Sequence, residues 1–274
     1  ILGQEKEKLV LTFDEMLRTS PFAEWMRSVL KTLEKAYRTP VDVEFAAEII
    51  PGKAGKVDLV LTILQCRPQS QLLQTEKESL PSTLAPEDIL FSTEFMVPQG
   101  HLDAIDYVVY VDPKGYFALP SHGERVNLAR IIGKLNAAME RECFILVGPG
   151  RWGSANSDLG VPIGYGDIYH TRALVELAGE GFGLPPEPSL GTHFFQDLLE
   201  SQIYPLAIQL DDPRSQFNEA FFATTPNRLE DWLPGSGEYQ ASLKVIRVND
   251  YAPGSRLKLV MNDDIGKAVA FLVR

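Results

Sequence analysis

Residues 41–67 read VDVEFAAEIIPGKAGKVDLVLTILQCR, and this stretch decides the fold of the N-terminal part of the chain. Val41, Val43 and Phe45 alternate with Asp42 and Glu44, which is typical of a strand with one buried face and one polar face. Residues 51–55 contain proline and glycine, and residues 57–66 form a second apolar run. The pattern predicts an antiparallel β-hairpin with strands at 41–45 and 57–66.

A helix is predicted directly before this hairpin. Ser20-Pro21 is a typical helix start, the apolar residues of 22–37 keep helical spacing, and Thr39-Pro40 ends the pattern. We therefore expect an amphipathic helix over 21–38.

The open end of the hairpin carries Glu44 on one strand and Gln65 and Arg67 on the other. In a regular strand, Leu59, Leu61 and Ile63 would share a face with Gln65 and Arg67. Carboxylate and amide oxygens are ligands that Mg²⁺ accepts, and a nearby guanidinium can neutralise a phosphoryl group. The pattern is equally typical of a solvated hairpin face, so both interpretations stay open at this point.

The segments YRTPVDVEFAAEI and LTILQCRPQS resemble the end of the ATP-grasp nucleotide-binding domain of phosphoenolpyruvate synthase and pyruvate phosphate dikinase. In that family a D-[I/V]-E-[F/W] strand is followed by an L-Q-x-R-P strand. The resemblance covers residues 10–69. It implies that Glu44 and Gln65 bind Mg²⁺ and ATP, and that Arg67 contacts the phosphates as a catalytic group.

The departures from the family are also informative. The glycine-rich, basic first part of such a domain does not precede Ile1, and no phosphoenolpyruvate-binding barrel follows. The sequence also lacks an initiating Met. We therefore expect an excised part of a longer phosphotransferase of kinase or dikinase type, with a fragment that is inactive by itself. The acceptor implied is pyruvate or another small molecule.

Composition limits the classes of partner. The chain has 274 residues, 45% of them hydrophobic, and a formal net charge of −11, which disfavours nucleic acid and anionic membranes as partners. No apolar run is long enough for a membrane span, and no signal peptide is recognisable, so we expect a cytoplasmic protein. Cys66 and Cys143 are expected to be ordinary buried thiols.

Three regions are predicted along the chain: the end of an ATP-grasp domain at 1–69, a linker at 70–86, and an α/β domain with a mixed sheet at 87–274, with α+β as the alternative. The second domain is expected to have strands near 88–97, 107–112, 143–147, 203–209, 243–248 and 257–273. Helices are expected after Ser121 and Pro226 and over 168–179 and 193–202. Its segments VVYVDP, GPGRWGS and SLGTHFF resemble the C-terminal region of bacterial pyruvate phosphate dikinase, phosphoenolpyruvate/pyruvate-binding-like proteins, which implies no particular activity.

A glycine-rich loop, Gly148-Pro149-Gly150-Arg151-Trp152-Gly153, follows the predicted strand 143–147. A dinucleotide fingerprint needs a helix that begins inside the motif, whereas 154–162 is loop sequence. Two other interpretations remain. The loop is either a structural turn or an anion site, formed by the amides of Gly148, Gly150 and Gly153 with Arg151.

His193 lies at the predicted start of the helix 193–202. It can be a structural residue, a ligand for an anion, or a catalytic nucleophile that accepts a phosphoryl group; the phosphohistidine domain of the dikinase family has a similar G-G-x-T-x-H context. We predict that His193 and the glycine loop converge on one concave, positively charged site. His101, His122 and His170 are expected to be surface or capping residues.

We predict an ATP- and Mg²⁺-dependent phosphotransferase fragment. The alternative is a non-catalytic ligand-sensing or interaction module that keeps an ATP-grasp hairpin as a scaffold.

Overall fold

The computed structural model describes residues 13–51, 57–68, 78–81, 83–179, 188–189 and 192–274. The chain forms two compact units, Ile1–Ser70 and Gln71–Arg274, and each is described by itself. Much of the predicted linker 70–86 lies outside the described residues, and its described part ends in a short 3₁₀ turn, η2 (Pro86–Asp88). No helix in the described part of the chain combines the length and the apolar composition that crossing a membrane requires.

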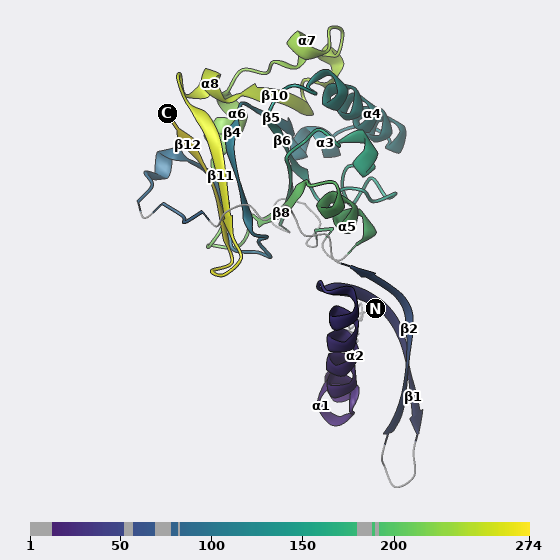
Figure 1. The fold of residues 1–274 in the computed structure, drawn as a ribbon. Coiled ribbons are helices and arrows are strands. Elements are labelled where there is room, and N and C mark those ends of the chain that lie inside the picture. The colour runs from purple at the N-terminus through teal and green to yellow at the C-terminus, as the bar shows by residue number, and fades with distance from the viewer. Residues whose placement is uncertain (1–12, 52–56, 69–77, 82, 180–187, 190–191) are drawn as a thin grey trace, which may run out of the picture. The chain divides into compact units, whose positions relative to one another are not determined.

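The described residues of the first unit form two helices and one hairpin (Figure 1). Helix α1 spans Asp14–Thr19 and α2 spans Phe22–Tyr37; strands β1 (Val41–Pro51) and β2 (Val57–Pro68) pair antiparallel. The Ser20 hydroxyl accepts a hydrogen bond from the amide of Phe22 at 3.2 Å, and Arg38 ends α2 in a left-handed conformation. The predicted helix and hairpin are therefore confirmed, with strands that are longer than expected.

A β-bulge changes which residues of β2 share a face. Glu44 pairs with Gln65, but Phe45 pairs with Ile63, so Leu64 is the extra residue. The expectation that Ile63 shares a face with Gln65 is therefore wrong, because the extra residue reverses the alternation at that point. Beyond the bulge, Leu61 and Leu59 join the apolar face of the hairpin.

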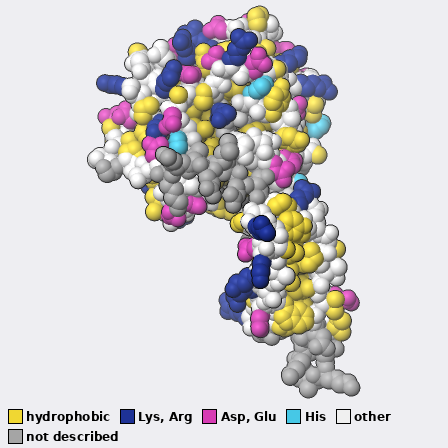
Figure 2. Space-filling model, in the orientation of Figure 1, with side chains coloured by type: hydrophobic (Ala, Val, Ile, Leu, Met, Phe, Trp, Pro, Cys, Tyr) yellow, Lys and Arg dark blue, Asp and Glu magenta, His cyan; other side chains and the backbone are white. Residues whose placement is uncertain are grey.

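Helix α2 packs on this apolar face through Phe22, whose ring lies 5.5 Å from that of Phe45. Phe22, Val41 and Leu59 are buried. Many large apolar side chains of this unit are nevertheless exposed, and Figure 2 shows hydrophobic side chains along its visible face. They include Phe13, Leu17, Trp25, Tyr37, Ile50, Val60 and Leu64.

The second unit contains two five-stranded sheets. The mixed sheet has the order β10-β5-β6-β7-β8, in which β5 to β8 are parallel and β10 is antiparallel. The antiparallel sheet has the order β4-β11-β12-β3-β9. The strands are β3 (Ile89–Thr93), β4 (Gly100–Ile105), β5 (Tyr107–Val111), β6 (Phe144–Pro149), β7 (Ala173–Ala178), β8 (Tyr204–Gln209), β9 (Gln216–Phe217), β10 (Leu243–Arg247), β11 (Arg256–Asn262) and β12 (Lys267–Val273).

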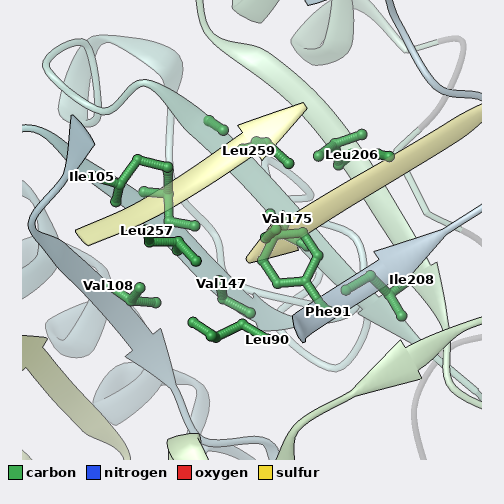
Figure 3. Close-up of a cluster of buried hydrophobic side chains, with 14 of the residues drawn as sticks. Leu90, Phe91, Ile105, Val108, Val147, Val175, Leu206, Ile208, Leu257 and Leu259 are labelled. Atoms are coloured by element: carbon green, nitrogen blue, oxygen red, sulfur yellow. The ribbon is translucent and has the colours of Figure 1, made fainter. Parts of the chain in front are cut away.

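Helices cover the outer face of the mixed sheet, and the antiparallel sheet covers its inner face (Figure 1). The core between the sheets combines Leu90, Phe91 and Leu257 of the antiparallel sheet with Val147 and Val175 of the mixed sheet (Figure 3). The helices are α3 (Pro113–Phe117), α4 (His122–Ala138), α5 (His193–Glu200), α6 (Glu219–Thr224), α7 (Leu229–Trp232) and α8 (Val248–Tyr251), with 3₁₀ turns η3 (Tyr165–Asp167) and η5 (Gly237–Tyr239).

The expected α/β class with a mixed sheet is confirmed, but one predicted element is wrong. Residues 173–178 form strand β7 within the predicted helix 168–179. All six residues of β7 are buried, because the strand lies between β6 and β8 with a core on each face. Such a strand shows no alternation, and Ala, Leu and Glu favour helices, so the local pattern was misleading.

Candidate functional site

The open end of the hairpin brings together the residues that the sequence singled out. Glu44 lies directly opposite Gln65, and Asp42 lies directly opposite Arg67. Directly opposed residues of an antiparallel pair share a face, and so do residues two apart in a strand. Asp42, Glu44, Gln65 and Arg67 therefore project from one face, opposite to the face that packs on α2.

Arg67 and Gln65 are in direct contact on this face. With the amide oxygen of Gln65 turned toward Arg67, it accepts hydrogen bonds from Nε and Nη2 of the guanidinium, the latter at 2.7 Å. This contact fixes both side chains side by side. The guanidinium thus occupies the Gln65 oxygen, which the resemblance assigns to a metal, and this oxygen would have to turn away from Arg67 to bind one.

The chemistry of this group of residues suits a magnesium nucleotide. Mg²⁺ takes oxygen ligands and commonly uses one or two protein oxygens together with substrate phosphates and water. Glu44 supplies a carboxylate and Gln65 an amide oxygen, while Arg67 supplies positive charge for a phosphate. The donor set therefore fits Mg²⁺ with ATP.

The glycine loop of the second unit uses its amides within the protein. The amides of residues 150–153 donate to the Leu177 carbonyl at 2.7 Å, the Leu159 carbonyl at 2.6 Å, the Glu176 carboxylate at 2.9 Å and the Val161 carbonyl at 3.1 Å. An anion held by these amides would have to displace those acceptors. The assignment of Gly148, Gly150, Arg151 and Gly153 to ligand binding stays a prediction that this hydrogen bonding does not support.

The glycines of this loop have packing roles instead. A Cβ on Gly148 would lie 2.6 Å from the buried ring of Trp152, and a Cβ on Gly153 would lie 2.4 Å from the ring of Phe194. Gly150 and Gly153 also have positive φ angles of 67° and 74°. Side chains at these positions would be strained, so the sequence pattern is explained by close packing and turns.

His193 begins α5 beside the same loop. Thr192 is the N-cap, and its hydroxyl accepts from the amide of Phe195 at 3.4 Å. Because a Cβ on Gly153 would lie against the ring of Phe194, the loop and the start of α5 lie side by side. The concave, positively charged site expected there stays a prediction. The His193 side chain is exposed, and its catalytic or phosphate-accepting role stays a prediction.

Glu176 joins these two segments, and the sequence reasoning missed it. Its Oε1 accepts from the amide of Trp152, and its Oε2 accepts from the amide of Ser189 at 2.6 Å. The Ser189 hydroxyl lies 2.5 Å from Oε1 and 2.8 Å from the Trp152 carbonyl. Burial raises the pKa of Glu176 to about 7, although the Ser189 and Trp152 hydrogen bonds and the charge of Arg151 oppose this. The sequence did contain a sign of this residue's role, because Glu176 is the single charged residue in the apolar segment 173–178.

A pocket of about 320 Å³ was also missed. It lies at the carboxyl ends of β5, β7 and β8, and its lining includes Tyr110, Asp112, Leu177, Leu210 and Phe222. These residues are up to about a hundred positions apart, and no local motif joins them. The order of the strands could have predicted the general location, since ligands of α/β sheets bind beyond the carboxyl ends of the strands.

His122 is exposed, as expected, whereas His101 is half-buried in β4 and the two cysteines are half-buried rather than buried. Nδ1 of His122 lies 2.8 Å from the Ser157 hydroxyl. Cys66 and Cys143 are free thiols, and burial raises the pKa of Cys143. His101 lies with Glu78 and Asp103, three groups whose potential ligand atoms are within 4.8 Å of one another. The Lys258 ammonium already bridges the two carboxylates at 2.5 and 2.9 Å.

Comparison with known proteins supports the nucleotide-binding assignment of the first unit. Residues 3–88 match the family model described as pyruvate phosphate dikinase, AMP/ATP-binding domain. This segment contains Glu44, Gln65 and Arg67 and is similar to the AMP/ATP-binding domain that the family model describes. The match ends at the 3₁₀ turn η2, so most of the second unit lies outside it. No curated protein and no solved structure matches the chain.

Proposed function

We propose that the hairpin β1–β2 forms one wall of a Mg²⁺-ATP site of ATP-grasp type in a cytoplasmic phosphotransferase. Glu44 and Gln65 would hold the metal, and Arg67 would neutralise the phosphates. The proposal rests on one observation: Glu44 and Gln65 are directly paired across the hairpin, and Arg67 projects from the same face. The family match to an AMP/ATP-binding domain supports the same assignment.

In this proposal the protein's own groups have distinct tasks. The Glu44 carboxylate balances the charge of the metal, and the Gln65 oxygen orients it without adding charge. Arg67 cannot lose its proton near neutral pH, so it keeps a positive charge beside the phosphates throughout a transfer. Mg²⁺ held by Glu44 and Gln65 would help to neutralise the negative charge of the phosphates. Pyruvate or another small molecule would accept the phosphoryl group.

A paramagnetic titration tests the metal site directly. Mn²⁺ replaces Mg²⁺ in complex with ATP, and amide signals of the whole chain are recorded by NMR. We expect the signals of Glu44 and Gln65 to broaden first. Removing a residue that only hydrogen-bonds to a metal ligand weakens metal binding by about 10–100-fold. Glu44 is proposed as a ligand itself, so Glu44→Gln should weaken Mn²⁺-ATP binding by at least about tenfold.

Glu48→Gln is the matched control, because Glu48 lies on the same strand and the same face, opposite Val60. It removes the same charge farther from Gln65 and should leave the affinity unchanged. Equal losses in both variants would indicate general electrostatic attraction. Broadening that is absent from Glu44 and Gln65 would reject the site.

A further inference from the structure

The pocket of the second unit lies where an α/β sheet commonly binds small molecules. Tyr110 and Asp112 come from the end of β5, Leu177 from β7, and Leu210 from the residue after β8. Residues of β9 and α6 complete the lining. Its volume of about 320 Å³ is at the lower end of the range for small-molecule pockets. All of its lining residues belong to the second unit.

One wall of the pocket is aromatic. The ring of Phe222 stacks on Phe217 with centroids 4.3 Å apart and an interplanar angle of 7°. Tyr110 packs against Phe222 at 4.7 Å, and Leu177 is fully buried beneath them. These side chains hold one another in place, so the wall is already formed. It suits a flat or aliphatic body.

The polar side of the pocket is predominantly acidic. Asp112 uses Oδ2 to cap α3, accepting from the Gly115 amide at 2.7 Å, while Oδ1 lies 3.5 Å from the Tyr110 hydroxyl. Glu219 lies in the first turn of α6. Burial raises the pKa of the Tyr110 hydroxyl, and the negative charges of Asp112 and Glu219 raise it further. Lys114 is the one cation among the lining residues.

We propose that this pocket binds a small organic cation whose apolar body lies on the aromatic wall and whose ammonium or guanidinium group is held between Asp112 and Glu219. Two carboxylates against one lysine favour a positive ligand and disfavour phosphates and carboxylates. The charge of this pocket therefore does not suit ATP or pyruvate as its ligand. This assignment does not depend on the proposed nucleotide function.

Three probes with a shared body test the proposal. 2-Phenylethylamine carries an ammonium, 2-phenylethanol is neutral, and 3-phenylpropionate carries a carboxylate. We expect the amine to shift the methyl NMR signals of Leu177 and Leu210 in the whole chain. The alcohol should bind more weakly, and the propionate should leave the signals unchanged.

Two variants remove one charge each with little change in shape. Asp112→Asn retains an oxygen that can cap α3, and Glu219→Gln retains the length of the side chain. Because a hydrogen bond to a charged group is worth about tenfold or more in affinity, each variant should weaken amine binding by about that factor. Glu87→Gln is the control, since Glu87 is an exposed residue in the first turn of η2 and does not line the pocket.

A third variant tests the location without changing charge. Ala223 lines the pocket and is exposed on α6, so Ala223→Trp should fill the space and abolish the shifts while the circular dichroism spectrum stays that of the folded protein. Propionate binding as tight as amine binding would overturn the proposal. So would amine affinity that is insensitive to Asp112→Asn and Glu219→Gln, or no shift with any probe.

Discussion

At the scale of single residues, Glu176 is a buried carboxylate that accepts hydrogen bonds from Trp152 and Ser189. When it is protonated, Oε1 can donate to the Ser189 hydroxyl, which in turn donates to the Trp152 carbonyl, while the amides of Trp152 and Ser189 still have acceptors. The neutral acid therefore satisfies every polar atom of this group. This agrees with the raised pKa of about 7.

The raised pKa predicts a pH-dependent stability. Folding raises the pKa of Glu176 above its ordinary value of 4.5, so its contribution to stability is largest below pH 4.5 and is lost as the pH rises toward about 7. The loss is on the order of 3 kcal/mol and should appear in urea unfolding between pH 5 and pH 8.

Glu176→Gln should remove this slope and also destabilise the protein by about 1–3 kcal/mol. A glutamine NH₂ group at either carboxylate position meets a backbone N–H of Trp152 or Ser189, which would lose its acceptor. Glu200→Gln, at the exposed end of α5, serves as a control for general charge effects. An unchanged slope in Glu176→Gln would contradict the assignment.

At the scale of the element, the bulge at Leu64 lies directly beside the Glu44–Gln65 pair. Leu64 is 64% exposed, and it has no pairing partner in the ladder. Deleting Leu64 should keep the pairs Glu44–Gln65 and Phe45–Ile63, because the remaining residues alternate correctly without it. The free energy of unfolding should change by no more than about 1 kcal/mol.

Cross-strand nuclear Overhauser effects between the backbone protons of the paired residues would measure this outcome. Leu64→Ala keeps the chain length and so separates the loss of a side chain from the loss of the bulge. If the deletion moved Glu44 to a different partner, the bulge would be the feature that sets the register.

At the scale of the whole molecule, the two units differ in how well they bury apolar surface. The second unit has two extensive cores formed by its own residues, whereas the described part of the first unit buries Phe22, Val41 and Leu59 as its large apolar side chains. We expect residues 71–274 alone to unfold cooperatively with the same midpoint as in the whole chain. A midpoint lower by more than about 4 °C, on the order of 1 kcal/mol, would show that its stability depends on the first unit.

The sequence predicted local patterns better than long-range ones. Alternation at 41–45 located the hairpin, and Ser121 capped its helix as expected, accepting from the Glu124 amide at 3.2 Å. The sequence contains only an indirect sign of the bulge. Without an extra residue, the apolar Leu61 and Ile63 would lie on the same face as the polar Gln65. Strand β7 was mistaken for a helix, since burial on both faces removes alternation. The antiparallel sheet and the pocket depend on contacts between distant segments, which no local pattern records.

The mixed sheet has a core on each face, and this limits where the second unit can do chemistry. Along β5, Val108 and Tyr110 belong to one core, and Val109 and Val111 to the other. A polar substitution in the middle of β5 would meet hydrocarbon whichever way it pointed. New binding properties can therefore arise at the strand ends and in the connections, where a changed side chain can reach solvent without opening either core.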